Sequence, residues 1–401
     1  MSAAATSTSV PHGIYADADI RCAATGRGAL DGLIFAAKDV FDIAGRVAGA
    51  GCPARAAVEA PACATAPVIL RLLDAGARLA GLTTTEEMMF GVLGQGEGAP
   101  DNPRAPDRLA GGSSIGSAVA VARGYCDFAL GTDTGGSVRV PASFCGLFGL
   151  RPSHGAVSTV GVVPLAPRFD TVGWFAATAE SLAEIGGVLL RKGPVAPVPR
   201  AVWVPPEITE GLDAALNAAL FSRAKALAAQ LGVPLATASI GSGPASWGQA
   251  WKALQGRAAW DTHGPWIETH RPALGPVAAR RFAAARAVSS AEFDAGNQIC
   301  TELERAVLPR LGSGWLLVMP TTPGPAPARH APEPELEGVR AAILSRTALA
   351  GLLGLPELTA PWLSVGGLPV GFSLIGPPGA DAALLLLARQ GAATLSETQH
   401  E

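Results

Sequence analysis

The stretch GTDTGGSVRVP, residues 131–141, places one serine, Ser137, directly after two glycines and shortly before a proline. It continues an apolar run, CDFALGTD (126–133), that is typical of a buried β-strand. A glycine-rich loop at the end of a strand can cradle a phosphate, expose a nucleophile or turn a corner. The G-K-[ST] ending of a phosphate loop is missing here. A nucleophilic Ser137 and a simple turn remain as the two interpretations.

Alternating strands and helices around this loop predict an α/β fold. Strands are expected at 33–37, 78–84, 126–133, 201–204, 234–240, 315–320 and 368–375, and helices at 66–77, 114–124 and 215–232. Residues 246–312 are predicted to be mostly helical, and a closing helix is expected near the end of the chain. We find no internal repeat and no linker. The simplest interpretation is a single α/β/α domain over 1–401, with a central mixed β-sheet covered by helices.

Composition limits the classes of function. Hydrophobic residues make up 49% and charged residues 16%, which excludes disorder and predicts a large core. A net charge of −3 without a basic block gives no support for a nucleic-acid partner. The six cysteines form no C-x-x-C pair, so we expect reduced thiols and no metal site. The start, MSAAATSTSV, does not resemble a signal peptide, and charged residues or prolines interrupt the apolar stretches. We therefore expect a cytoplasmic protein without a membrane partner, and a homodimer stays open.

Three other motifs compete with Ser137. GQGEGA (94–99) fits a dinucleotide pattern, but an expected helical stretch precedes it and Pro100 follows. GSSIG (112–116) formally matches a nucleophile elbow around Ser114, but two prolines upstream argue against the required strand. His154 would be the usual base for a serine, yet no histidine lies in a glycine-rich or acidic cluster. A nucleophilic serine in this chain therefore needs a different base.

Lys38 is the alternative base. It follows the apolar run LIFAA (33–37), so a half-buried position is plausible, and burial lowers the pKa of an amine until it can accept a proton. The other interpretation is an exposed loop lysine paired with Asp39 or Asp42. Spacing alone favours the exposed lysine.

Residues 111–155, GGSSIGSAVAVARGYCDFALGTDTGGSVRVPASFCGLFGLRPSHG, resemble the signature of the amidase signature family of serine hydrolases. FAAKDVFD (35–42) resembles the lysine motif of that family, and 368–388 resembles its C-terminal motif. The resemblance implies the amidase signature fold. It also implies a signature core at about 30–180 and a variable substrate-side region at about 196–312.

The resemblance implies a Ser-cis-Ser-Lys triad that needs no cofactor. Ser137 would be the nucleophile, Ser113 the bridging serine on a cis peptide bond, and Lys38 the base. The backbone N–H groups that would form the oxyanion hole belong to Thr134, Gly135, Gly136 and Ser137. The residues expected to support this loop are Asp133 and Arg139, which would pair behind it, and Ser114. Ile115 replaces a glycine found in many members, so a narrower site is expected.

At a finer level, residues 139–176, 254–268 and 318–327 are similar to plant-type indole-3-acetamide amidohydrolases. This similarity implies hydrolysis of a small aryl- or alkyl-acetamide-type primary amide to the acid and ammonia, through an acyl-enzyme on Ser137. An amidotransferase subunit acting on charged tRNA and a non-catalytic amidase-like binding module are the alternatives. The presence of Ser137 argues for an enzyme. Candidate pocket residues are Trp247, Trp251, Trp260, Trp266, Met88, Met89 and Phe90.

Overall fold

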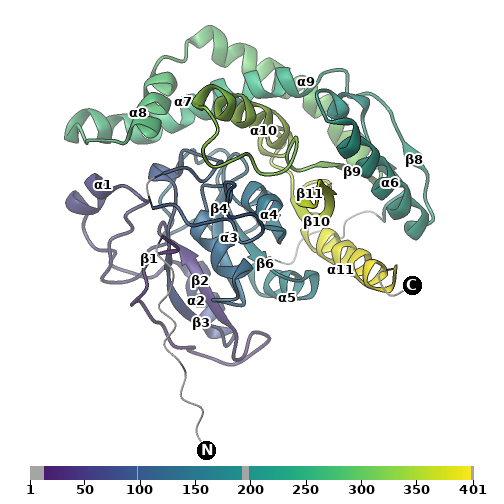
Figure 1. The fold of residues 1–401 in the computed structure, drawn as a ribbon. Coiled ribbons are helices and arrows are strands. Elements are labelled where there is room, and N and C mark those ends of the chain that lie inside the picture. The colour runs from purple at the N-terminus through teal and green to yellow at the C-terminus, as the bar shows by residue number, and fades with distance from the viewer. Residues whose placement is uncertain (1–12, 97, 192–197, 399–401) are drawn as a thin grey trace, which may run out of the picture.

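The computed structural model describes residues 13–96, 98–191 and 198–398, so the MSAAATSTSV start lies outside the described residues. One mixed sheet of eleven strands runs through the molecule (Figure 1). Its strands are β1 (Tyr15–Asp17), β2 (Ile34–Lys38), β3 (Arg78–Thr83), β4 (Phe128–Asp133), β5 (Phe148–Arg151), β6 (Thr171–Ala176), β7 (Ala201–Trp203), β8 (Leu235–Ala236), β9 (Trp315–Pro320), β10 (Glu357–Val365) and β11 (Leu368–Ile375). Their order in the sheet is β1-β3-β2-β4-β6-β5-β10-β11-β9-β7-β8.

Parallel pairs lie toward the two ends of the sheet and antiparallel pairs fill its middle. β2 runs parallel to both β3 and β4, and β7 runs parallel to both β8 and β9. The central strands β4, β6, β5, β10, β11 and β9 pair antiparallel in succession. Central strands such as β4 and β6 are buried along their whole length, as expected of strands covered on both faces.

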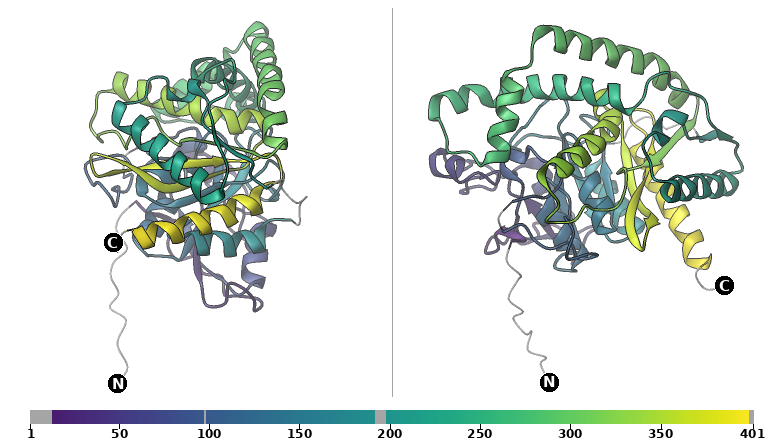
Figure 2. Two further views of the ribbon diagram at one scale, coloured as in Figure 1. Left: turned by 90° about the vertical axis from the view of Figure 1, so that its right-hand side faces the viewer. Right: turned by 45° about the horizontal axis from the view of Figure 1, so that its top comes forward.

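Helices cover the sheet on both sides (Figures 1 and 2). They are α1 (Pro53–Val58), α2 (Pro67–Asp74), α3 (Ile115–Ala122), α4 (Arg139–Cys145), α5 (Ala179–Leu189), α6 (Ala214–Leu231), α7 (Pro244–His270), α8 (Pro276–Arg286), α9 (Ser290–Gly312), α10 (Glu333–Leu353) and α11 (Asp381–Thr398), with 3₁₀ turns η1 (Glu87–Met89) and η2 (Pro206–Thr209). Helices α2, α5 and α11 contact one another in sequence, and α3 contacts α4. Helix α7 contacts α8, α9 and α10, and these helices lie together along one side of the molecule. The mixed sheet covered by helices confirms the predicted fold class.

Two local predictions are wrong. The strand expected at 234–240 is reduced to Leu235–Ala236, because β8 is an edge strand and its one partner among the described residues, β7, is itself three residues long. The helical stretch expected before GQGEGA is a single 3₁₀ turn, η1, followed by irregular chain. Met88 and Met89 in this turn have positive φ angles of 51° and 58°, so the backbone cannot continue as a right-handed helix.

A bilayer-spanning helix does not occur in the described part of the chain, where no helix is both long and apolar enough.

Adjacent glycines on α5 give a test of the helix packing. A Cβ at Gly186 would lie 2.4 Å from Leu385 Cδ1 of α11 and 3.3 Å from Trp174, whereas a Cβ at the exposed Gly187 meets nothing within 4 Å. Gly186→Ala should therefore destabilise the fold by about 1–2 kcal/mol through overpacking. Gly187→Ala should stabilise it by about 0.5–1 kcal/mol through helix propensity. Urea unfolding measures both changes, and equal effects would contradict the close α5–α11 contact.

Candidate active site

Three chain segments meet at the carboxyl end of β2 and β4. Because these strands are parallel neighbours with Ala37 opposite Leu130, Lys38 at the end of β2 lies beside the end of β4. The loop from Thr134 to Val138 continues from β4 and leads into α4. Residues 111–114 precede α3, which contacts both strands. The topology thus brings together the segments that carry Lys38, Ser113 and Ser137.

Lys38 is fully buried, so the interpretation as an exposed loop lysine is wrong. Its Nζ lies 2.8 Å from Oγ of Ser113 and 2.9 Å from Oγ1 of Thr132. Burial disfavours the ammonium form and lowers the pKa of Lys38 to about 7, against the opposing influence of Glu86 and Asp133. Near neutral pH a large fraction of this amine is therefore unprotonated and able to accept a proton.

Ser113 follows a cis peptide bond from Gly112 and is fully buried. The neighbouring loop fixes this segment through the backbone. The N–H of Glu86 donates to the carbonyl oxygen of Ser113 at 3.1 Å, and the N–H of Gly112 donates to that of Val92 at 2.9 Å. These contacts hold the Ser113 side chain on the side of Lys38.

Ser137 lies in the loop after β4 and is 4% exposed. Its hydroxyl donates to the carbonyl oxygen of Gly91 at 3.3 Å, and within the described residues no hydrogen bond joins it to the Ser113 hydroxyl. The two loops are adjacent, because the N–H of Ser114 donates to the Ser137 carbonyl oxygen at 3.3 Å. The chain of polar contacts is thus closed between Lys38 and Ser113 and open between Ser113 and Ser137.

Asp133 divides the N–H groups of the loop into two sets. Its carboxylate accepts from the N–H groups of Gly136 at 2.8 Å, Val138 at 3.1 Å and Arg139 at 3.2 Å. The expectation that the Gly136 N–H serves the oxyanion hole therefore does not fit the structure, since that donor is already occupied. In the described part of the chain, the N–H groups of Thr134, Gly135 and Ser137 have no hydrogen-bond acceptor.

Behind the loop lies a fully buried ionic cluster, made of Asp133, Arg139, Arg151 and Glu357. Arg139 contacts the Asp133 carboxylate through Nη2 at 2.8 Å and Nε at 3.0 Å, and its Nη1 lies 2.5 Å from Oε2 of Glu357. Arg151 Nη1 lies 3.2 Å from Oδ1 of Asp133. Burial alone would raise the pKa of Asp133, but the charges and hydrogen bonds of the two arginines hold it well below its usual range. The structure thus brings Asp133 and Arg139 together behind the loop.

Ser114 links the end of β4 to the start of α3. Its Oγ lies 3.3 Å from both the N–H and the carbonyl oxygen of Thr132. Gly131 permits this approach, because a Cβ there would lie 2.7 Å from Ser114 Oγ.

Sequence reasoning missed several residues of the site. Thr132 contacts Lys38, and Glu86 is a buried carboxyl group whose Oε2 has no hydrogen-bond partner among the described residues. Asp170 accepts a hydrogen bond from Thr134 Oγ1 at 2.6 Å and so fixes the beginning of the loop. Thr132 was signalled by its place inside GTDTGGS, whereas no local pattern marks Glu86 or Asp170.

A narrow cleft of about 30 Å³ opens at Ser137. Its walls include Met89, Phe90 and Trp251, three of the pocket residues proposed from the sequence. The other four pack into the protein interior instead. Trp247 is fully buried, and Met88 forms a small apolar cluster with Cys52 and Phe282. Trp260 and Trp266 pack against this cluster.

Ile115 does not narrow this cleft, contrary to expectation. It is 3% exposed and lines a different cavity together with Thr84 and Glu86. His154 is also apart from the site, because its Nε2 contacts the carbonyl oxygen of Pro167. Among the residues that the structure describes, no group of His, Cys, Asp or Glu is arranged to hold a metal ion.

Comparison with known proteins places the chain in a family. The amidase family model matches residues 12–197. Amidase 1 of Arabidopsis thaliana is 38% identical over 391 residues, which cover 89% of this chain and 92% of that protein. The chain belongs to the amidase family. A solved amidase crystal structure superposes with a TM-score of 0.81 at 29% identity, covering 92% of this chain and 86% of the other.

The chain is also similar to a protein that is named as a translocon. The translocon at the outer membrane of chloroplasts 64 of Pisum sativum is 34% identical over 384 residues. This match covers 89% of the present chain and 65% of the pea protein. The family thus gives the fold, the similarity to Amidase 1 supports the hydrolase class, and the individual substrate depends on residues specific to this chain.

The buried ionic cluster gives a stability test. Arg139→Met leaves the Asp133 and Glu357 carboxylates without their shared partner and should lower the free energy of unfolding by about 3–5 kcal/mol. Arg280→Met removes an exposed arginine that pairs with Glu333 at 2.5 Å and should change it by less than about 1 kcal/mol. Urea unfolding measures both variants. A similar loss in both would show that the cluster does not stabilise the fold.

Proposed function

We propose that this protein is an amidohydrolase that cleaves a small primary amide to the carboxylic acid and ammonia, through an acyl-enzyme on Ser137. The observation that carries the proposal is the buried Lys38, whose Nζ lies 2.8 Å from Ser113 Oγ. Burial lowers the pKa of Lys38 to about 7. A fully buried lysine with hydroxyl partners is suited to act as a base near neutral pH. Membership of the chain in the amidase family and its similarity to Amidase 1 support the same reaction class.

The first half of the reaction forms the acyl-enzyme. Neutral Lys38 accepts a proton from Ser113, and Ser113 accepts one from Ser137 as its Oγ attacks the amide carbonyl carbon. For this step the Ser137 hydroxyl turns from the Gly91 carbonyl toward Ser113, since catalytic hydrogen bonds often tighten only when substrate is bound. The tetrahedral intermediate collapses with loss of ammonia, which takes up the proton held by the relay.

Unoccupied backbone donors of the loop are available to bind the developing negative charge. The N–H groups of Thr134, Gly135 and Ser137 are free to bind the oxyanion, whereas Asp133 retains the Gly136 N–H. Losing one such donor typically costs about 3–4 kcal/mol of transition-state stabilisation. Water then attacks the acyl ester by the same proton relay and releases the carboxylic acid.

The apolar walls of the cleft favour an aryl- or alkyl-acetamide-type primary amide. Phe90 and Trp251 lie beside Ser137 and offer flat apolar surfaces to the acyl group. Gly135 permits this arrangement, because a Cβ there would lie 3.0 Å from the Trp251 ring.

Ser137→Ala tests the nucleophile. We expect ammonia release from phenylacetamide and from short alkyl amides to fall by roughly 10⁴-fold or more, because the acyl-enzyme cannot form. A coupled ammonia assay measures the rates. Ser313→Ala, at an exposed serine after α9, is the matched control and should keep wild-type activity. Undiminished hydrolysis by Ser137→Ala would refute the proposed nucleophile, and release of ammonia from glutamine alone would favour an amidotransferase subunit.

The pH dependence tests the base. Because Lys38 must be neutral, kcat/KM should rise about tenfold per pH unit below pH 7 and level off above the Lys38 pKa of about 7. Amide hydrolysis is measured from pH 5 to 9, with circular dichroism showing that the fold persists. Burial raises the pKa of Asp39 to about 6, so Asp39 could also produce a rise in rate over this pH range. If Asp39→Asn keeps the same rise of kcat/KM with pH, Asp39 is excluded as its cause. A flat or falling profile would contradict Lys38 as the base.

A further inference from the structure

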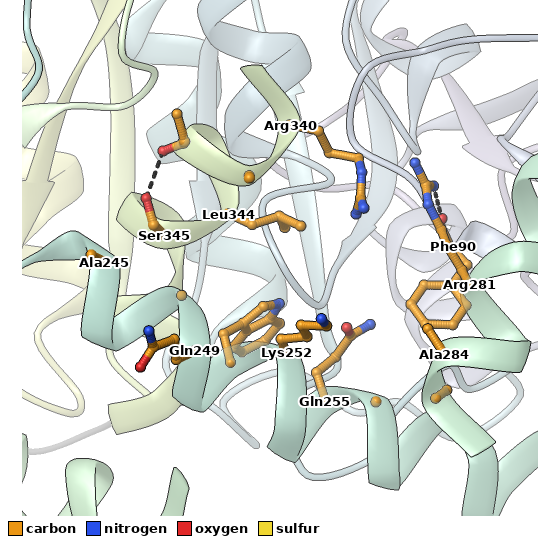
Figure 3. A pocket seen from close by; sticks show the side chains of 16 residues that line it. Phe90, Ala245, Gln249, Lys252, Gln255, Arg281, Ala284, Arg340, Leu344 and Ser345 are labelled. Carbon is orange, nitrogen blue, oxygen red and sulfur yellow. Dashed lines mark hydrogen bonds between the residues drawn. The ribbon is translucent and has the colours of Figure 1, made fainter. Parts of the chain in front are cut away.

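A larger cavity of about 470 Å³ adjoins the cleft at Ser137. The two share the wall residues Phe90, Trp251, Gln255, Arg340 and Leu344. Helices α7, α8 and α10 enclose the larger cavity, and Figure 3 shows Arg340 and Leu344 of α10 opposite Lys252 and Gln255 of α7. The cleft of about 30 Å³ has room for little more than the reacting amide. The remainder of an acyl group bound to Ser137 therefore extends into the larger cavity.

The wall of this cavity carries an excess of positive charge. Lys252, Arg281 and Arg340 line it, and no acidic residue is among its described lining residues. Within the described part of the chain, Lys252 has no carboxylate within 4.0 Å. Three cations around one cavity repel one another unless an anion enters, so the arrangement favours a negatively charged ligand.

Arg281 is the most deeply buried of the three, with an exposed fraction of 7%. Its Nη1 donates to the carbonyl oxygen of Phe90, whereas Nε and Nη2 have no hydrogen-bond partner among the described residues. These two nitrogens carry the parallel N–H bonds of one edge of the guanidinium group, which is the edge that binds a carboxylate in bidentate geometry. Both nitrogens are covered by protein, so a carboxylate in the cavity binds them once the Arg281 side chain turns toward it, and it then satisfies two buried donors that otherwise lack a partner.

Three carboxylates act on these cations, and none of them lines the cavity. Glu292 influences Lys252 electrostatically from outside the cavity wall without an ion pair within 4.0 Å. Glu337 accepts hydrogen bonds from Nε and Nη2 of Arg340 at 2.9 and 2.7 Å, leaving Nη1 of Arg340 unbonded in the described structure. Glu86 influences Arg281 electrostatically but is not within 4.0 Å as an ion pair. Both residues line a second cavity, which also has Asp39 and Glu87 in its wall. The cavity thus keeps a net positive charge after Glu337 is counted.

We propose that the acyl group of the substrate ends in a carboxylate that binds among Lys252, Arg281 and Arg340. The substrate is then the half-amide of a dicarboxylic acid, with its carbon chain between Trp251 and Leu344 and its amide at Ser137. This inference rests on the proposed amidohydrolase function and replaces a neutral acyl group with an anionic one.

Matched pairs of amides test the inference. Each pair has the same chain length and differs in one terminal group: succinamate against butyramide, glutaramate against pentanamide, adipamate against hexanamide, and 4-carboxyphenylacetamide against phenylacetamide. For at least one pair we expect the carboxylate member to have a roughly 10- to 100-fold higher kcat/KM, the size expected for hydrogen bonds to a charged group. The preference should weaken as salt concentration rises.

Variants assign the preference to named side chains. Arg281→Met and Lys252→Met should each lower the ratio of kcat/KM between the carboxylate amide and its neutral partner by about tenfold. Partial unfolding, or a shift of the loop that carries Ser137, would lower kcat/KM for the carboxylate amide and for its neutral partner alike and leave their ratio unchanged. Arg280→Met, one residue away on α8 and outside the cavity wall, removes the same charge and should leave the ratio and the activity at wild-type values.

Calorimetry with the Ser137→Ala variant separates binding from turnover. Binding of glutaramate or adipamate that weakens when Arg281→Met is added supports the inference. Hydrolysis of neutral amides with equal or higher kcat/KM overturns the inference and leaves the proposed function standing. Charge-dependent binding without hydrolysis of any amide overturns the proposed function and leaves the anion site standing. Absence of both binding and hydrolysis overturns both.

Discussion

The ion pair between Asp133 and Arg139 is the interaction on which the rest of the site depends. A carboxylate buried this deeply is stable only if its charge is balanced and its oxygens are fully hydrogen-bonded. Arg139 and Arg151 supply the charge, and the loop N–H groups supply the remaining hydrogen bonds. Glu357 on β10 pairs with Arg139, so two carboxylates balance the two arginines. Four charges thereby tie β4, β5, β10 and α4 to the loop that presents Ser137.

The same carboxylate decides which loop donors are left for chemistry. Asp133 occupies the Gly136 N–H, while the N–H groups of Thr134, Gly135 and Ser137 stay unoccupied. The φ angle of 121° at Gly136 belongs to a conformation that side-chain-bearing residues rarely adopt. Glycine at 136 thus lets one N–H turn back toward Asp133 while its neighbours point elsewhere.

Strands, helices and loop motifs that depend on neighbouring residues could be predicted from the sequence. Contacts between residues far apart in the chain could not. The strands and helices around GTDTGGSVRVP follow from local periodicity, and their positions agree with β2, β3, β4, α2 and α3. Besides Asp133, Arg139 has two distant partners, Glu357 218 residues away and Thr347 208 residues away, and no motif marks either of them. Spacing favoured an exposed Lys38, and this was wrong. The burial of a single lysine depends on the elements that cover it rather than on its flanking residues, so the local sequence does not reveal it. The cations of the large cavity come from three helices between residues 252 and 340, so only the fold brings them together.

The proposed catalytic groups and the larger cavity come from different parts of the chain. The proposed bond-breaking groups all come from residues 38–137, whereas most of the larger cavity comes from α7, α8 and α10. The two parts meet where the ring of Trp251 lies against Gly135 and where Arg139 donates to the carbonyl oxygen of Thr347 on α10. Substitutions on the helices away from these two contacts can exchange one acyl group for another without moving the reacting atoms. Substrate range and chemistry are thus separately adjustable, and an engineer seeking a new amide would begin on α7, α8 and α10.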